Sequence, residues 1–279
     1  MTPLPAMVSV AVVGSGISGL LCAQSIIQQA PGVSVSVFEW GRGPGGRTAR
    51  RRITINGTQA SFDHAAPYFA ASSDLFRAGA LKDWQARGLV APWLGKFGSF
   101  DAAPGKLPSP LADDGERWLG VPTMHSICRT LAADLEGSGG EMCYGRHVLS
   151  TIFSRDTGRW RVTANNRFAE ADQASEVRDF DALVLSDKLL VLPNIYAVLP
   201  ENLAGPLSLP PLSSEGCVVL LVALDRARLR NRDTCMDDWD VLEARGSEGG
   251  GSDAPVRLII HESKKPLRDS SAELDLWVV

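Results

Sequence analysis

The chain has 279 residues, of which 44% are hydrophobic and 22% are charged, enough apolar material for one large core or two modest ones. The formal net charge of −4 gives no basis for binding nucleic acid or an anionic membrane. Five cysteines and four histidines are scattered without metal-ligand spacing, and no run of about 18 apolar residues occurs. We therefore expect no disulfide framework, no metal centre and no membrane-spanning helix.

The N-terminal residues 1–6 are short and rich in proline, and the first predicted strand follows them at once. This leaves no room for a signal or transit peptide. A reducing, cytoplasmic location is the expectation.

The stretch from Val8 to Glu39 predicts a strand, a glycine-rich turn, a helix and a second strand. β-branched residues mark the first strand over 8–13, the helix is expected over 20–29, and the second strand over 33–38. Glu39 ends the second strand, where a carboxylate would accept hydrogen bonds from the 2′- and 3′-hydroxyls of a ribose. The turn has the pattern G-x-G-x-x-G and consists of Gly14, Ser15, Gly16, Ile17, Ser18 and Gly19.

Each glycine of this turn has an expected role in dinucleotide binding. Gly14 permits the tight turn, Gly16 lets the backbone approach a pyrophosphate, and Gly19 lets the helix pack on the strand. The N–H groups at the helix start would face the phosphates. A structural glycine turn beside a solvated Glu39 is the alternative, because a chain with 27 glycines also produces this pattern by chance.

A second glycine-rich turn follows Glu39 and Trp40 directly and ends in Gly45, Gly46, Arg47 and Thr48. Its backbone N–H groups and a guanidinium would reach the same pyrophosphate. Domains that bind NAD do not ordinarily need this second turn.

These motifs, in this order, resemble those of the FAD-dependent amine oxidase superfamily, with its G-x-G-x-x-G turn, ribose-binding acid and following G-G-R turn. The resemblance implies FAD as the cofactor. In such domains a valine at the position of Val148 holds the adenine edge through its backbone. The candidate cofactor-binding residues are Gly14, Ser15, Gly16, Ile17, Ser18, Gly19, Glu39, Trp40, Gly45, Gly46, Arg47, Thr48 and Val148.

Residues 62–69 resemble the D-x-G-A-x-Y-F/I segment of the renalase-like branch, which lies against the flavin. Ala65 and Pro67 depart from that pattern, and Pro67 cannot donate a backbone hydrogen bond. The resemblance makes His64 and Tyr68 candidates for positions near the flavin ring. The alternative is that Tyr68 is a core aromatic residue.

Two further segments resemble the same branch: residues 120–124, at the start of a helix predicted from Met124, and the turn 263–266. A solvated, charged turn is the alternative interpretation of residues 263–266.

A hairpin is expected over 150–163 and a central parallel strand over 180–186.

The predicted fold class is α/β, with a Rossmann-type FAD-binding domain and an inserted substrate domain built on a mixed or antiparallel sheet. The FAD-binding domain is expected to be discontinuous, comprising residues 1–70 and 121–190. The substrate domain would comprise residues 71–120 and 191–279. Members of the superfamily continue with a G-D turn and a closing helix that contact the flavin, so relative to them we expect this chain to be C-terminally incomplete.

The resemblance implies an FAD-dependent oxidoreductase in which a small molecule, a reduced nicotinamide or an amine, transfers a hydride to the flavin and oxygen reoxidises it. The incomplete flavin site leaves a catalytically impaired or non-catalytic flavin-fold binding protein as the alternative. An NAD-dependent dehydrogenase is a third interpretation, which the G-G-R turn disfavours. The sequence selects neither a substrate nor an oligomeric state.

Overall fold

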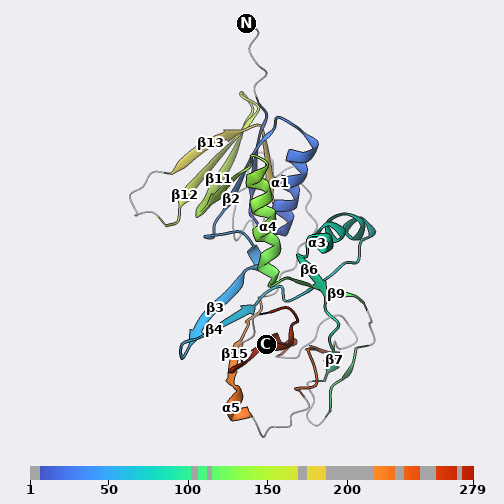
Figure 1. Ribbon diagram of the computed structural model, residues 1–279. Helices are drawn as coiled ribbons and strands as arrows, with labels where there is room; N and C mark the ends of the chain where they lie inside the picture. Colours follow the sequence, from blue (N-terminus) through green and yellow to red (C-terminus); the bar gives the residue numbers. More distant parts are fainter. Residues whose placement is uncertain are drawn as a thin grey trace. The chain divides into compact units, whose positions relative to one another are not determined.

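The computed structural model has two compact units, here called the first unit (Met1–Gly46 with Cys128–Glu215) and the second unit (Arg47–Ile127 with Gly216–Val279). Figure 1 shows both units and labels many of their helices and strands. The residues that the structure describes are 7–101, 106–111, 115–168, 175–186, 216–229, 236–245, 256–268 and 272–279. The domain boundaries expected from the sequence stay a prediction.

A four-stranded parallel sheet forms the centre of the first unit, in the order β10-β2-β1-β14. Its strands are β1 (Ser9–Val13), β2 (Ser34–Glu39), β10 (Glu141–Tyr144) and β14 (Ala182–Leu185). Because the strands are parallel, their carboxyl ends all lie at one edge of the sheet. We call this edge the carboxyl edge.

Among the described residues, two α-helices belong to this unit in whole or in part, α1 (Ile17–Gln29) and α4 (Met124–Gly137). The predicted strand-helix-strand order is confirmed, with α1 beginning at Ile17 rather than at Leu20. α1 and α4 lie side by side (Figure 1), and the Gln24 side-chain amide donates a hydrogen bond of 2.9 Å to the carbonyl of Leu131.

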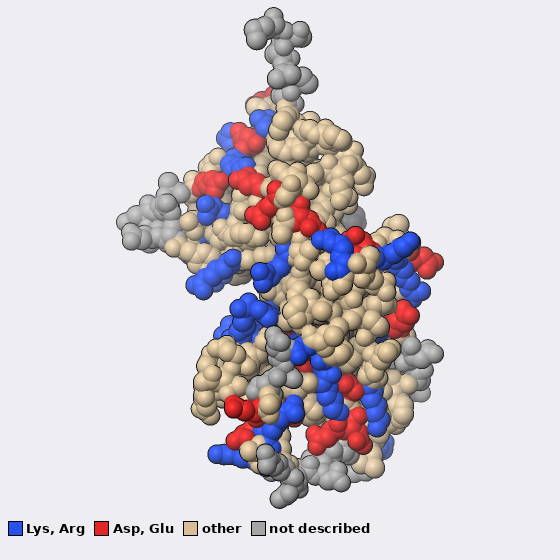
Figure 2. All heavy atoms as spheres, in the orientation of Figure 1, with Lys and Arg blue, Asp and Glu red and all other residues tan. Residues whose placement is uncertain are grey.

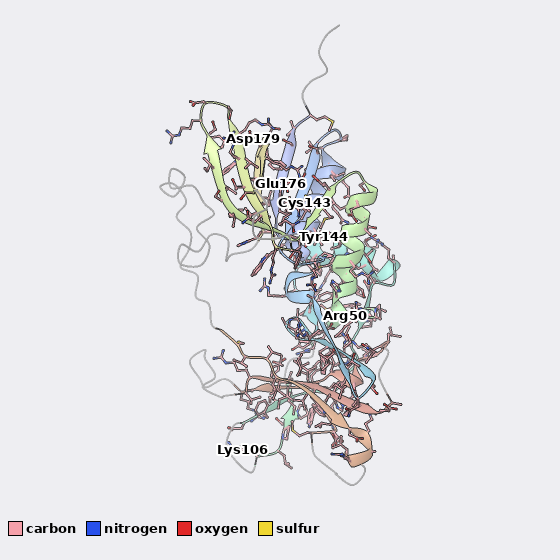
Figure 3. The ribbon with its side chains drawn as sticks, turned by 90° about the vertical axis from the view of Figure 1, so that its left-hand side faces the viewer. Arg50, Lys106, Cys143, Tyr144, Glu176 and Asp179 are labelled. Atoms are coloured by element: carbon pink, nitrogen blue, oxygen red, sulfur yellow. The ribbon has the colours of Figure 1, made fainter. Side chains whose placement is uncertain are left out.

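A three-stranded antiparallel sheet packs on one face of the parallel sheet. Its strands are β11 (Arg146–Ser154), β12 (Arg159–Asn166) and β13 (Glu176–Phe180), in that order. A hydrophobic core joins the two sheets and consists of Ala11, Val13, Phe38, Val148, Val162, Ala164 and Phe180. At the surface, Arg178 of β13 bridges to Glu141 of β10 at 2.7 Å. Figure 3 labels the neighbouring residues Cys143 and Tyr144 on β10 and Glu176 and Asp179 on β13.

The strand predicted over 180–186 differs from the structure. Phe180 ends β13, β14 begins only at Ala182, and β14 lies at the end of the described sheet rather than at its centre. The break falls at Asp181, whose carboxylate accepts hydrogen bonds from the N–H and the hydroxyl of Ser9 at 2.8 and 2.7 Å. The Asp181 side chain thus lies between the end of β13 and the start of β14 and links this point of the chain to β1.

The second unit contains a hairpin and two sheets. β3 (Arg50–Ile55) and β4 (Thr58–Asp63) form the hairpin, and its two-residue turn has positive φ at Asn56 and Gly57, as Asn-Gly turns favour. A short antiparallel sheet has the order β5-β9-β6, with β5 at Phe69–Ala70, β6 at Val90–Pro92 and β9 at Arg117–Gly120.

The larger sheet of the second unit has the order β15-β18-β17-β16-β7-β8. It is mixed, because β16 pairs with β7 in parallel while the other neighbours are antiparallel. Its strands are β7 (Phe97–Phe100), β8 (Ser109–Pro110), β15 (Leu221–Asp225), β16 (Val241–Ala244), β17 (Leu258–His261) and β18 (Leu274–Val278).

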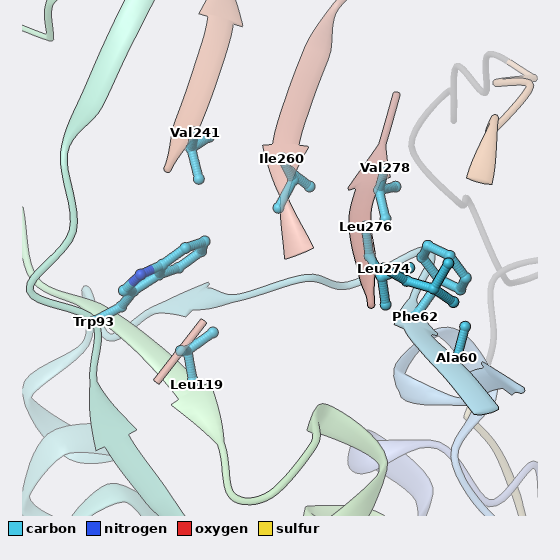
Figure 4. Close-up of a cluster of buried hydrophobic side chains, with 9 residues drawn as sticks. All are labelled: Ala60, Phe62, Trp93, Leu119, Val241, Ile260, Leu274, Leu276 and Val278. Atoms are coloured by element: carbon cyan, nitrogen blue, oxygen red, sulfur yellow. The ribbon is translucent and has the colours of Figure 1, made fainter. Parts of the chain in front are cut away.

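One face of this mixed sheet packs into the core of the second unit (Figure 4). The core consists of Ala60, Phe62, Trp93, Leu119, Val241, Ile260, Leu274, Leu276 and Val278. Alternate residues of β18 enter it, as the two-residue period of a strand requires. The described helical segments of this unit include α2 (Asp74–Phe76), the π-helical η2 (Arg77–Leu81), α3 (Lys82–Ala86), α5 (Arg226–Leu229) and the 3-10 turn η5 (Glu262–Lys264).

On the face drawn in Figure 2, Lys and Arg side chains of the described residues are interspersed with Asp and Glu side chains, in keeping with the small net charge. Within the described ranges, every helix is too short or too polar to cross a bilayer.

Candidate functional site

The first glycine-rich turn connects the end of β1 to α1 at the carboxyl edge. The Gly14 N–H donates to the carbonyl of Phe38 at 2.8 Å, and the φ angle of Gly14 is +100°, a conformation that side chains disfavour. A Cβ atom on Gly14 would lie 2.5 Å from Oγ of Ser186. The Ser186 hydroxyl in turn donates a hydrogen bond of 2.8 Å to the carbonyl of Val13. The Ser186 side chain therefore packs against the turn at Gly14.

Gly16 and Gly19 have opposite surroundings at the start of α1. A Cβ on Gly19 would lie 2.1 Å from the carbonyl oxygen of Gly14, whereas a Cβ on Gly16 would meet no atom of the described residues within 4 Å. Gly16 is the N-cap of α1, no described side chain caps the helix, and its first turn holds no acidic residue. The first N–H groups of a helix lack intrahelical acceptors and carry partial positive charge. The start of α1 therefore offers backbone N–H donors next to Gly16, where the space at the Cβ position is open.

The carboxylate of Glu39, at the end of β2, contacts both glycine-rich turns. Its Oε2 accepts hydrogen bonds from the N–H and the hydroxyl of Ser15 at 3.0 and 2.5 Å. Its Oε1 accepts the N–H of Gly41 at 2.6 Å. Oε1 has a second lone pair, so the group can still accept a hydrogen bond from a hydroxylated ligand.

The second glycine-rich turn lies against the first. The Gly45 N–H donates to the carbonyl of Ser15 at 2.9 Å. Gly46 has a φ angle of +52°, and a Cβ there would lie 3.5 Å from Cα of Gly16. Gly145, between β10 and β11, donates its N–H to the carbonyl of Gly41 at 2.9 Å. The two turns and the β10–β11 connection therefore form one hydrogen-bonded group.

Trp40, His147 and Arg167 form a stacked group of two rings and a guanidinium next to the glycine-rich turns. The Trp40 indole is 47% exposed and stacks on the His147 ring, with centroids 5.4 Å apart. The Arg167 guanidinium lies over the same indole, 4.4 Å from its centroid. Val148, next to His147, is buried in the core of the first unit, where it pairs with Ala164.

The structure thus brings Gly14, Ser15, Gly16, Gly45 and Gly46 together around Glu39. It adds residues for which sequence reasoning assigned no role, namely Gly145, His147 and Arg167, which no motif marks. Arg47 and Thr48 follow Gly46 in the 3-10 turn η1 (Gly46–Thr48); Arg47 is exposed and Thr48 is buried.

His64 and Tyr68, the residues expected near a flavin ring, belong to the second unit. The Tyr68 hydroxyl donates to Oε1 of Glu243 at 2.7 Å, and its ring packs edge-on against Trp93 and Phe97. Burial raises the pKa of Tyr68, and the hydrogen bond to Glu243 raises it further. Tyr68 is therefore a neutral residue whose hydroxyl donates a hydrogen bond to Glu243 and whose ring packs against two aromatic side chains.

The second unit also encloses four charged side chains, Asp63, Glu262, Lys265 and Arg268, which we call the buried charge cluster. Lys265 contacts Glu262 and Asp63 at 2.8 and 3.4 Å, and Arg268 pairs with the same two carboxylates. Burial lowers the pKa of Arg268 to about 10, lowers the pKa of Lys265, and raises that of Glu262. The interpretation of residues 263–266 as a solvated turn is wrong for Lys265, whose side chain is fully buried.

Comparison with known families agrees with the geometry of the first unit. Residues 12–81 match the model of the NAD(P)-binding Rossmann-like domain. The chain is a mixed α/β protein with a Rossmann-like dinucleotide-binding domain, as the sequence predicted. The match begins at Val12 near the end of β1, covers α1, β2 and both glycine-rich turns, and extends into the second unit.

Solved structures of similar fold extend the likeness over nearly the whole chain. A putative protoporphyrinogen oxidase from Exiguobacterium sp. 255-15 aligns over 98% of this chain and 76% of its own, with 11% identity and a TM-score of 0.60. Putrescine oxidase bound to putrescine aligns over 97% and 74%, with 11% identity and a TM-score of 0.59. A flavoprotein/dehydrogenase from Cytophaga hutchinsonii aligns over 97% and 55%, with 15% identity and a TM-score of 0.50.

At these identities the likeness is one of fold. The chain spans about half of the flavoprotein/dehydrogenase, at 55%, and 32% of a further aligned protein, the Diels-Alderase PyrE3.

Proposed function

We propose that this chain is an FAD-dependent oxidoreductase of the renalase-like or amine-oxidase-like type, acting on a small-molecule substrate. The observation that carries the proposal is the position of Glu39, whose two carboxylate oxygens accept N–H groups from both glycine-rich turns at 3.0 and 2.6 Å. The Rossmann-like match and the shared fold with proteins described as oxidases and as a flavoprotein support it.

The residues of the first unit suit the ADP half of FAD. Glu39 would accept the ribose hydroxyls, and the start of α1 at Gly16 would donate N–H groups to the pyrophosphate. The open space at the Gly16 Cβ position supports this role, because a phosphate oxygen must approach the backbone closely there. Arg47, which directly follows Gly46 and is the first residue of the second unit, would add a guanidinium to the pyrophosphate, and Val148 would hold the adenine edge through its backbone.

Remaining candidate contacts come from Ser15, Ile17, Ser18, Gly19, Trp40, Gly45, Gly46 and Thr48. Bound FAD would supply a ring that accepts a hydride from the substrate and is reoxidised by oxygen. The protein's part is to bind, orient and exclude water. His64 and Tyr68 are proposed to line the ring site, and there the Glu243-held hydroxyl of Tyr68 would present a lone pair to a donor on the substrate.

The test is the cofactor content and cofactor affinity of the purified full chain. We expect the protein to retain flavin, visible as its absorbance bands, and the stripped protein to bind FAD in preference to NAD or NADP in calorimetric titrations. Glu39→Gln removes the charge while keeping the shape and should weaken FAD binding by about tenfold or more. Glu136→Gln, at an exposed position of α4, is the matched control and should bind FAD normally.

Other results would favour the rival functions. Binding of NAD or NADP but not FAD by flavin-free protein would support the dehydrogenase interpretation. If neither amines nor reduced nicotinamides reduce the bound flavin in the absence of oxygen, so that its absorbance does not fall, the result would support the non-catalytic binding protein. Failure to bind any dinucleotide would overturn the proposal.

A further inference from the structure

The mixed sheet of the second unit has a second face, opposite its hydrophobic core. Leu274, Leu276 and Val278 of β18 enter the core, so the alternate residues Asp275 and Trp277 point the other way. On that side lies a cavity of about 300 Å³, lined by Asp275 and Trp277 among others. Its lining residues all belong to the second unit.

The walls of this cavity are mainly apolar. They include Val222 and Leu224 of β15, Ile259 of β17 and the indole of Trp277. Ligand pockets occupy roughly 300–1,000 Å³, and a dry cavity of roughly 150 Å³ can hold benzene. The cavity therefore has room for one ring with a short substituent.

The ionisable residues among its described lining are both acidic, Asp237 and Asp275. The Asp275 side chain is only 10% exposed and its orientation is determined by its neighbours. Its Oδ1 lies 2.7 Å from Nε2 of His261 and 3.4 Å from the Arg226 guanidinium, while its Oδ2 accepts the indole N–H of Trp277 at 2.6 Å. Among the residues that the structure describes, Oδ2 thus has one donor, which leaves it one lone pair.

His261 completes this arrangement from the neighbouring strand. Its ring stacks on the Trp277 indole, with centroids 3.8 Å apart and an interplanar angle of 20°. The imidazole is 7% exposed, so the stack and the hydrogen bonds hold both the carboxylate and the indole in one position at the cavity wall. A positioned acid within apolar walls selects ligands by charge as well as by shape.

We propose that this cavity is a binding site for a small hydrophobic cation, a molecule with one ring and one ammonium group. The ring lies against Val222, Leu224 and Trp277, and the ammonium group donates to Oδ2 of Asp275. The inference goes beyond the proposed dinucleotide site, because it uses only residues of the second unit and requires no bound cofactor.

Isothermal titration calorimetry of the full chain with three probes of equal size tests the proposal. The probes are cyclohexylmethylamine, cyclohexylmethanol and cyclohexanecarboxylate, which are cationic, neutral and anionic at pH 7. We expect the amine to bind about tenfold more tightly than the alcohol, and the carboxylate not to bind. Equal affinity for amine and alcohol, binding of the carboxylate, or no binding of the amine would overturn it.

Variants locate the site. Leu224→Trp fills the cavity from a position that is 37% exposed and should abolish amine binding. Val177→Trp makes a similar change at a 55% exposed residue of β13 in the first unit and should leave amine binding intact. Asp275→Asn should remove the preference for the amine over the alcohol. Because Asp275→Asn can also disturb the fold, thermal unfolding is recorded for each variant, and the result for Leu224→Trp decides: retained amine binding there refutes the site.

Discussion

Nζ of Lys265 lies 2.8 Å from Oε2 of Glu262, and neither side chain is more than 1% exposed to solvent. Asp63 and Arg268 complete the buried charge cluster, so two acids and two bases are paired inside the second unit. Oδ2 of Asp63 also accepts the N–H of Met124 at 3.3 Å, at the first residue of α4. The cluster therefore connects the end of β4, the start of α4 and the turn after β17.

Replacing Lys265 by methionine should strongly destabilise the protein. The change leaves Glu262 and Asp63 with one cation between them in a buried site, and breaking a buried ion pair costs about 3–5 kcal/mol. Urea unfolding at pH 7 measures the loss. Arg161→Met, which breaks an exposed pair with Asp179, is the control and should have little effect. Equal effects of the two changes would show that the cluster does not contribute as a buried network.

Removal of Asp275 should reduce the acid sensitivity of the fold. Burial raises the pKa of Asp275, but hydrogen bonds from His261 and Trp277, together with the nearby positive charge of Arg226, outweigh burial, and the net pKa lies below the ordinary value of 3.8. Between these two values the unfolded chain binds more protons than the folded one, so the free energy of unfolding rises with pH. The contribution of this carboxylate is complete above about pH 4 and is lost as the pH falls through the folded-state pKa.

Asp275→Asn should therefore flatten the dependence of unfolding free energy on pH below about 4, as urea titrations at several pH values would show. Asp83→Asn, at a side chain that is 58% exposed, should keep the slope of the unchanged protein. An unchanged slope in Asp275→Asn would contradict the assignment.

Alanine at Gly16 and at Gly19 should have different consequences. At Gly19 the new Cβ would lie 2.1 Å from the carbonyl oxygen of Gly14, so the backbone must move, at a cost of about 1–3 kcal/mol. At Gly16 it meets no atom within 4 Å, and stability should fall by less than about 1 kcal/mol. On the proposed function, Gly16→Ala should nevertheless weaken FAD binding by about tenfold or more, because it obstructs the approach of the pyrophosphate. Thermal unfolding and FAD titration of both variants separate the two effects.

Truncation of Phe62 should open a cavity in the core of the second unit. Phe62 is fully buried, and Phe→Ala changes in such positions cost about 3–5 kcal/mol. Leu94→Ala, at a residue that is 93% exposed, should change stability by no more than about 0.5 kcal/mol. Chemical unfolding of both variants checks the difference, and a small loss in Phe62→Ala would mean that the core tolerates the cavity.

The strand-helix-strand start of the chain was predictable because its signals are local. β-branched residues, the glycine pattern and an acid at the end of the second strand all fall within the first 39 residues. Local periodicity also predicted α4 and the β11–β12 hairpin. The break at Asp181 was missed, because it depends on a hydrogen bond to Ser9, which is 172 residues away in the sequence.

Other parts of the candidate site depend on contacts between distant segments. Gly145 donates to Gly41 and Arg167 lies over Trp40, yet neither residue belongs to a motif. The buried charge cluster was not predicted either, because a lysine in a turn ordinarily indicates solvent exposure. From their composition, residues 245–254 are expected to form a loop and residues 190–216 a crossing back to the substrate domain. Apart from Arg245 and Gly216, both segments lie outside the residues that the structure describes.

The hydrogen bonds from Ser15 and Gly41 to Glu39 have a consequence for the kinetics and entropy of ligand capture. With the carboxylate held from both sides, the turn residues have already lost much of their conformational freedom before any nucleotide arrives. A preorganised site pays less ordering entropy when it binds and needs no slow rearrangement. The amide protons of Ser15 and Gly41 should accordingly exchange slowly with deuterated water even in protein stripped of nucleotide.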